Sequence, residues 1–92
     1  MKVENMTSSR GTRVANQFRI FADEGVYFQS YSTIIAFKPY PRPNYGNKIR
    51  LDRDAWDYSV TTGKYRNIFL GEKKSETDRK IKSGEYILTD LN

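Results

Sequence analysis

Hydrophobic and polar residues alternate along the first half of the chain in the way that β-strands require. In "VANQFRIF" (14–21), Phe18 and Ile20 fall on one side and Arg19 and Phe21 on the other. The segment "ADEG" (22–25) follows as a turn, with Gly25 able to take a positive φ. "VYFQSY" (26–31) then resumes the alternation, so we expect a β-hairpin over residues 14–31.

The next apolar run, "TIIAF" (33–37), is β-branched and predicts a strand buried on both faces, although its length also fits a short helix. "KPYPRPNYGN" (38–47) interrupts the pattern, because its three prolines lack a backbone donor and favour extended geometry. "KIRL" (48–51) predicts a further short strand.

Helical spacing replaces the alternation in the second half. Asp52 or Asp54 can cap a turn. Thr61 or Thr62 is expected to cap a helix that Gly71 ends. The apolar stripe of that helix consists of Tyr65, Ile68 and Phe69.

A second helix is predicted from Ser75, with Asp78 three residues later in a capping box, to Gly84. Thr77 and Ile81 share its inner face, and "EYILTDL" (85–91) closes the chain as a strand. The order β-β-β-β-α-α-β predicts the α+β class. We expect a mostly antiparallel sheet of four to five strands with two or three short helices on one face.

The polar segment 1–13 has no periodicity, so we expect a flexible basic N-terminal arm there. Residues 14–92 are expected to form a single α+β domain, because a chain of 92 residues supports one core. The segment "MKVENMTSSRGTR" has no hydrophobic stretch after its lysine, which argues against a signal peptide. No apolar run approaches the ~20 residues that a membrane-spanning helix needs.

The sequence contains no cysteine and no histidine. This composition excludes disulfide frameworks, thiol nucleophiles, zinc fingers and catalysis by Ser-His or Cys-His pairs. Asp52, Asp54 and Asp57 can in principle gather around a magnesium ion, but they fit the first turn of a helix better, since no second carboxylate cluster would complete the site. We therefore expect no enzyme, no cofactor and no metal.

The net charge of +5 is unevenly distributed along the chain. Residues 1–21 carry an excess of three positive charges and residues 37–53 an excess of four. Such a concentration favours an anionic partner, either nucleic acid or an acidic protein surface, although a small domain also carries charge for solubility.

The proline-rich segment and the residues after it interleave aromatic rings with cations. The candidate binding residues are Lys38, Tyr40, Arg42, Tyr45, Lys48 and Arg50. Single-stranded nucleic acid is held in this way, with about 1–3 kcal/mol for each stacked base. Tyrosine and arginine also dominate protein-interface hot spots, and a stiff connection whose tyrosines fold back onto the sheet is a third interpretation.

"SVTTGKYRNIFLGE" (59–72) carries hydroxyls, a glycine and cations at the predicted start of a helix. It is not a nucleotide-binding P-loop, because Tyr65 follows Lys64 and no glycine precedes Gly63 at the required spacing. An anion site at the helix start is one interpretation. Its residues would be Thr61, Thr62, Lys64 and Arg66. The simpler interpretation is that the threonines cap the helix and the charges face solvent.

Four segments resemble a family of small uncharacterised proteins encoded by bacteriophages and prophages. They are "VANQF", "YFQSYSTIIAF", "LDRDAWDYSVTTGKYRNIFLGE" and "KIKSGEYILTDLN", and together they span roughly residues 10–92. The resemblance implies a viral protein that works in the cytoplasm of the bacterial host. We expect an accessory binding protein that engages and modulates or inhibits a host protein, such as a nucleic-acid-handling or defence factor. The alternative is direct, sequence-tolerant binding of single-stranded DNA or RNA.

Overall fold

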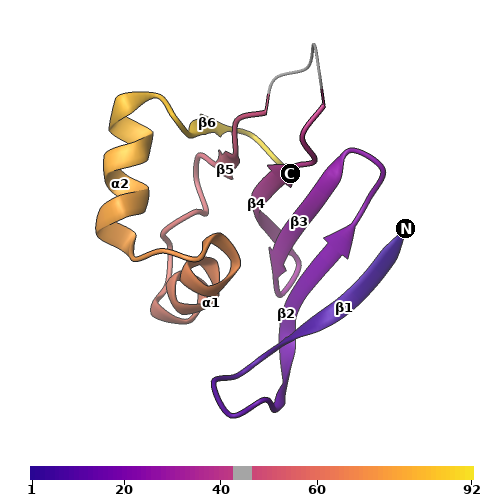
Figure 1. The fold of residues 1–92 in the computed structure, drawn as a ribbon. Coiled ribbons are helices and arrows are strands. Elements are labelled where there is room, and N and C mark those ends of the chain that lie inside the picture. Colours follow the sequence, from indigo (N-terminus) through magenta and orange to yellow (C-terminus); the bar gives the residue numbers. More distant parts are fainter. Residues whose placement is uncertain (43–46) are drawn as a thin grey trace.

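The computed structural model describes residues 1–42 and 47–92 and forms an α+β fold, as the sequence predicted. Its elements are β1 (Lys2–Thr7), β2 (Arg13–Phe21), β3 (Gly25–Ser30), β4 (Thr33–Pro39), β5 (Arg50–Asp52), α1 (Val60–Leu70), α2 (Lys74–Ser83) and β6 (Ile87–Thr89). The strands form one sheet in chain order, antiparallel from β1 to β5 and parallel between β5 and β6 (Figure 1). Six strands are more than the four to five expected.

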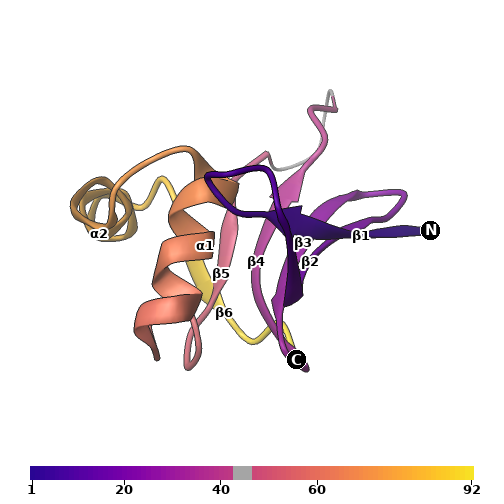
Figure 2. The ribbon, with the colours of Figure 1, turned by 90° about the horizontal axis from the view of Figure 1, so that it is seen from below.

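Both helices lie on the same side of the sheet, as predicted (Figure 2). They form the connection that a parallel pair of strands needs, between β5 and β6. The ring of Phe69 on α1 stacks on Phe28 of β3 with 5.7 Å between the ring centroids. In the described part of the chain, no helix covers the opposite face of the sheet.

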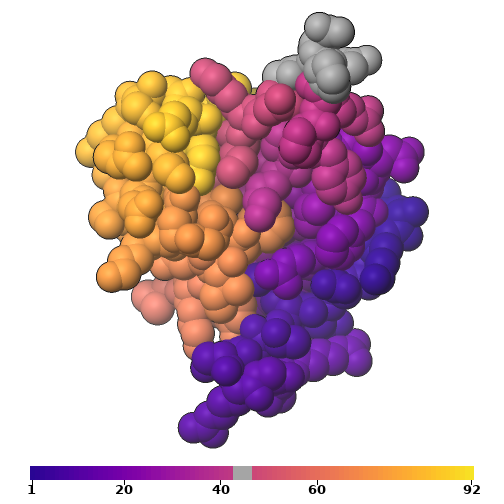
Figure 3. Space-filling model, in the orientation of Figure 1, coloured from indigo at the N-terminus to yellow at the C-terminus, as the bar shows by residue number. Residues whose placement is uncertain are grey.

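The hydrophobic core lies between the sheet and the helices. Its buried members are Met6, Phe28, Ile35, Ala36, Leu51, Ala55, Tyr65, Phe69 and Tyr86. Removal of these side chains from water supplies the main driving force for packing the helices on the sheet. Sheet and helices form one continuous body, from which the turn between β1 and β2 projects (Figure 3).

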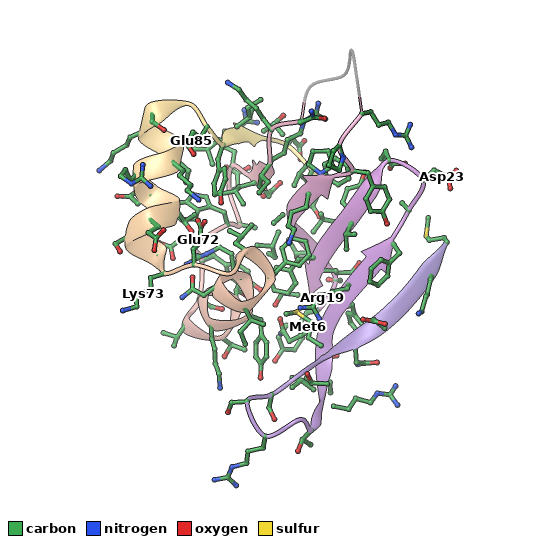
Figure 4. All side chains as sticks on the ribbon, in the orientation of Figure 1. Met6, Arg19, Asp23, Glu72, Lys73 and Glu85 are labelled. Carbon is green, nitrogen blue, oxygen red and sulfur yellow. The ribbon has the colours of Figure 1, made fainter. Side chains whose placement is uncertain are left out.

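The N-terminal segment is a strand, and the prediction of a flexible arm over 1–13 was wrong for most of it. β1 pairs with β2 from Lys2 opposite Phe21 to Thr7 opposite Arg13. Met6 is fully buried in the core (Figure 4). At the edge of the sheet only this one side chain needs to be strongly apolar, so the polar composition that suggested an arm is compatible with a strand.

The predicted hairpin over 14–31 is present as β2 and β3, and "TIIAF" lies in the strand β4. Gly25 has no positive φ; close packing explains why a glycine stands there. A Cβ atom at this position would lie 2.3 Å from the Lys38 carbonyl oxygen and 2.8 Å from Cε1 of Phe37. The hairpin thus needs a glycine so that the Phe37 ring can cross it.

Helix α1 begins earlier than predicted. Its N-cap is Ser59, whose Oγ accepts a hydrogen bond of 3.1 Å from the Thr62 backbone N–H. Thr62 is buried inside the first turn, so the prediction that Thr61 or Thr62 caps the helix was wrong. Gly71 ends the helix with φ of 71°, as predicted.

Helix α2 also begins before the predicted residue. Its N-cap is Lys73, which makes no side-chain capping bond, so the predicted capping box from Ser75 does not start the helix. Gly84 ends it with φ of 85°, as predicted, and Thr77 is buried on its inner face.

The last two strands are shorter than the predicted 48–51 and 85–91, and each has three residues. Asp52, at the end of β5, accepts a hydrogen bond of 3.2 Å from the Asp54 N–H. This contact confirms the prediction that an aspartate caps the turn before α1.

Candidate binding surface on the uncovered face of the sheet

The side of the sheet opposite the helices carries a continuous row of side chains. Phe28, Ala36 and Leu51 are cross-strand partners that belong to the core, so their neighbours along each strand point the other way. On that other side of the sheet, the register aligns six residues in a row, one from each strand. They are Val3, Ile20, Tyr27, Phe37, Arg50 and Ile87. We call this row the uncovered face.

A hollow of about 280 Å³ opens at the middle of the uncovered face. Tyr27, Phe37 and Arg50 line it from the strands, and Pro39, Tyr40 and Arg42 line it from the end of β4 and the segment after it. We call it the central hollow. Two hydrogen bonds hold that segment beside the β2–β3 turn: the Tyr40 N–H donates to the Glu24 carbonyl at 3.0 Å, and Arg42 donates to the Asp23 carbonyl at 2.6 Å.

The floor of the central hollow is aromatic. The rings of Tyr27 and Phe37 are 4.5 Å apart between centroids, and Phe37 is only 6% exposed. The Tyr27 hydroxyl donates to the Glu24 carboxylate at 3.0 Å. Burial and this hydrogen bond raise the pKa of Tyr27 above its ordinary value, so the phenol is neutral at physiological pH.

Five of the six predicted binding residues lie in the described part of the chain, and they fall into two groups. Tyr40, Arg42 and Arg50 gather around the central hollow, and Tyr40 is 40% exposed. Lys38 points to the helical side, where it donates to the Phe69 carbonyl at 3.0 Å. Lys48 donates to the Gly84 carbonyl, at the end of α2, at 2.8 Å. Tyr45 lies outside the described residues.

The four residues of the predicted anion site are divided between interior and surface. Thr62 is 1% exposed, and its hydroxyl lies 3.2 Å from that of Ser30 and 3.0 Å from that of Ser59. Thr61 is exposed, and Lys64 lies over the Tyr65 ring, 5.5 Å from its centroid. Neither interpretation describes the segment fully, because Ser59 and not a threonine caps the helix and Thr62 and Arg66 are buried.

Arg66, the fourth residue of that set, is a buried anchor with 1% of its surface exposed. One nitrogen donates to the Trp56 carbonyl at 2.7 Å and to Asp57 at 3.3 Å, and another donates to the Asn67 side chain at 3.0 Å. Its guanidinium also lies over the Trp56 ring at 5.2 Å. These contacts fasten the turn before α1 to the helix, a role that the sequence did not reveal.

A broad depression of about 670 Å³ lies beside the first turns of α1. Lys64, Arg66, Lys74 and Asp57 contribute charges to its lining. The Asp57 carboxylate pairs with Lys74 at 2.7 Å as well as with Arg66. Burial alone would raise the pKa of Asp57, but the hydrogen bonds from Lys74 and Arg66 outweigh it and lower the pKa.

Asp52 and Asp57, two of the three aspartates considered as a magnesium site, have separate partners. The Asp52 carboxylate accepts hydrogen bonds from the Leu91 N–H at 2.9 Å and from the Asn92 side chain at 3.0 Å. These bonds lower the pKa of Asp52 although burial opposes them. Within residues 1–42 and 47–92, no group of three or more acidic side chains is placed to hold a metal ion.

Sequence reasoning missed Tyr27, Phe37 and Glu24 as parts of the central hollow. The first two lie in strands that alternation predicted, but alternation alone does not tell which face of a strand packs under helices. Their cross-strand partners Ile20 and Arg50 would have been the available signal, once the register was known.

In the part of the chain that the structure describes, neither helix is long and apolar enough to cross a membrane.

Comparison with curated proteins and with solved structures gives no match. A protein-family model matches residues 1–85, a range that includes β1, the uncovered face as far as β5, and both helices. The chain therefore belongs to the family of unknown function DUF8033.

Proposed function

We propose that this chain is a non-enzymatic, bacteriophage-encoded accessory protein that engages a host protein through the uncovered face of its sheet and modulates or inhibits it. The resemblance of four segments to phage and prophage proteins supports the viral origin. The place of action that follows is the cytoplasm of the bacterial host. The class of partner includes factors that handle nucleic acid or defend the cell.

One observation carries the proposal: the row of side chains that crosses the six strands, over which residues 1–42 and 47–92 place no helix. Val3 and Ile87, at the two ends of the row, are 57% and 41% exposed. Tyr40, Arg42 and Arg50 stand around the hollow at its centre. Aromatic and arginine side chains at the centre of an apolar patch are the usual composition of a protein-interface hot spot.

The distribution of charge favours a protein over a nucleic acid as the partner. Binding along a phosphate backbone depends on several cations that follow the strand. Lys38 and Lys48 instead donate to carbonyl groups at the ends of α1 and α2. Two arginines remain at the central hollow, and the Glu24 carboxylate stands beside them. This mixture suits a protein surface of mixed polarity.

The absence of cysteine and histidine from the sequence supports a role without catalysis. Three acidic groups with strong contacts, Asp52, Asp57 and Glu72, are occupied by hydrogen bonds and ion pairs within the fold. Their positions support a structural role for these carboxylates.

The experiment is affinity capture from nuclease-treated bacterial lysate with the immobilised chain. The wild-type protein should retain a host protein in stoichiometric amount. The double variant Tyr40→Ala, Arg50→Glu should lose it, because the variant removes an exposed ring and reverses a charge at the centre of the interface.

The matched control is Lys73→Glu. It makes the same change of charge on an exposed side chain that points away from the body on the helical side (Figure 4). The control should retain the host protein. Equal loss in both variants, or no stoichiometric protein in the wild-type sample, would contradict the proposal.

A second candidate is direct, sequence-tolerant binding of single-stranded DNA or RNA. The observation that favours it is the Tyr40 ring, 40% exposed beside two arginines, which is the arrangement on which a base can stack. This function predicts micromolar or tighter binding of oligothymidylate that weakens steeply with salt. The variant Tyr40→Ala, Arg42→Ala should weaken the binding without unfolding, and flat titrations at low salt would exclude this function.

A further inference from the structure

The central hollow is small and its floor is firm. Its volume of about 280 Å³ lies just below the range of about 300–1,000 Å³ that is usual for sites of whole small molecules. Phe37 is packed against Tyr27 and crosses Gly25, where any Cβ atom would collide with it. A site of this size with an aromatic floor suits one large apolar side chain.

The rim of the hollow is positive on balance. Arg42 is held in place by its hydrogen bond of 2.6 Å to the Asp23 carbonyl. Arg50 lies on β5, where it pairs with Phe37 of β4 in the register. Among the described residues at the rim, Glu24 supplies the one carboxylate, and it accepts the hydrogen bond of the Tyr27 hydroxyl. Two guanidinium groups therefore face a single carboxylate, and an incoming carboxylate would find a cation.

We propose that the central hollow receives an aromatic or large aliphatic side chain that is flanked by carboxylates, so that the partner contributes an acidic segment with one apolar anchor. The inference rests on the proposed function and names the chemistry of its partner. The apolar anchor covers the rings of Tyr27 and Phe37. The flanking carboxylates reach Arg42 and Arg50, which offer several N–H donors in a planar array.

A single-stranded nucleic acid fits these observations less well. A stacked base would need neighbouring cations for its phosphates on both sides of the hollow, and the Glu24 carboxylate occupies one of those sides. Lys38 and Lys48, the nearest lysines in sequence, hold the ends of the helices.

The test uses the whole chain and short synthetic probes, followed through backbone amide chemical shifts in NMR spectra. The main probe is a capped pentapeptide with phenylalanine between two glutamates. The comparison probes carry lysines in place of the glutamates, or alanine in place of the phenylalanine. Oligothymidylate forms the nucleic-acid arm.

The glutamate–phenylalanine peptide should shift the amides of Tyr27, Phe37 and Arg50 in a saturable way. Replacement of its phenylalanine or of its glutamates should weaken binding about tenfold or more. Arg50→Gln should cause a similar loss, whereas Lys73→Gln on the helical side should cause none. The unchanged amide pattern elsewhere shows that the variants are folded.

Two outcomes overturn the inference: no shift at millimolar peptide, or equal shifts with the lysine peptide. Shifts of the same amides by oligothymidylate alone would assign the hollow to nucleic acid instead. The result is separable from that of the capture experiment. Capture of a host protein without peptide binding would contradict only the inference of an acidic segment with an apolar anchor. Peptide binding without capture would contradict only the proposal of a host-protein partner.

Discussion

At the scale of single residues, the Glu72 carboxylate joins α1, α2 and the segment before β6. It lies between the two helices (Figure 4) and accepts hydrogen bonds from Thr77 at 2.6 Å, Tyr86 at 2.7 Å and Lys80 at 2.8 Å. Burial alone would raise the pKa of Glu72, but these three donors outweigh it and hold the pKa below its ordinary value. A single buried carboxylate thus fixes how α2 packs on the rest of the protein.

Because Tyr86 donates to Glu72, we expect the protein to lose stability in alkali. Burial and the hydrogen bond to Glu72 raise the pKa of Tyr86 from 10.0 to about 12. The folded state thus favours the neutral phenol, and the corresponding stability is present below pH 10 and lost as the pH rises towards about 12. The shift corresponds to about 3 kcal/mol in the free energy of unfolding.

Urea unfolding measured across this pH range checks the prediction. Tyr86→Phe should be less stable near neutral pH, because Glu72 loses a donor, and should decline less steeply in alkali. The hydrogen bond with Glu72 also raises the pKa of Lys80. Because Lys80 is still present in Tyr86→Phe, the variant should still lose some stability in alkali. Parallel curves for the wild type and the variant would contradict this role of Tyr86.

Two glycines respond in opposite directions to replacement by alanine. Gly25→Ala should lower the free energy of unfolding by about 1–3 kcal/mol, because the added Cβ meets the Lys38 carbonyl oxygen at 2.3 Å. Gly63→Ala should raise it by about 0.5–1 kcal/mol. This residue lies inside α1, and its nearest neighbours are guanidinium nitrogens of Arg66 at 3.7 Å. Chemical denaturation of the two variants decides both predictions, and destabilisation by Gly63→Ala would show that the helix start is tighter than described.

At the scale of elements, β1 is the strand that composition did not reveal. Its pairing with β2 and the complete burial of Met6 make the N-terminus part of the folded core. The strand is also the edge of the sheet, so its remaining side chains are mostly polar and exposed.

Truncation of Met6 tests whether β1 contributes to stability. Met6→Ala should cost about 2–4 kcal/mol in the free energy of unfolding, because it leaves a cavity in the core. Val3→Ala, on the same strand, should cost less than about 0.5 kcal/mol, since Val3 is 57% exposed. Equal and small effects of the two substitutions in thermal or urea unfolding would show that residues 2–7 do not contribute to the folded core.

The predictable elements are those whose signal is local. Alternation around Phe18 and Ile20 predicted β2, and Gly71 and Gly84 marked the ends of both helices. The starts of the helices were misplaced because several residues near each start are suitable caps, and only the fold selects Ser59 or Lys73. The parallel pairing of β5 with β6 depends on how the two helices cross the sheet, which a short apolar run such as 87–89 does not encode by itself.

At the scale of the whole molecule, the two faces of the sheet differ in what covers them. One face holds the core beneath the helices, and the other presents the row from Val3 to Ile87. Stability and the proposed binding should therefore be separable by substitution of the exposed side chains on the uncovered face. This separation also makes the capture and NMR experiments interpretable.

Substitutions around the central hollow test the separation. Tyr40→Ala and Arg50→Gln should change the free energy of unfolding by less than about 0.5 kcal/mol each, because both side chains are exposed. Phe37→Ala should cost about 3–5 kcal/mol, since its ring is 6% exposed and packs on Tyr27. Denaturant titrations give these values directly, and strong destabilisation by Tyr40→Ala would mean that this ring serves the core.

The sequence by itself determined the class of the fold, the order of most elements, the absence of cysteine and histidine chemistry and the concentration of cations in 37–53. These properties follow from local periodicity and composition. Only the tertiary structure decided that Lys38 and Lys48 hold helix ends, whereas Tyr40, Arg42 and Arg50 meet Tyr27 at one hollow. The physical reason is that the side of a sheet on which a residue lies depends on strand register and on which face the helices cover, and both are set by contacts between residues far apart in the chain.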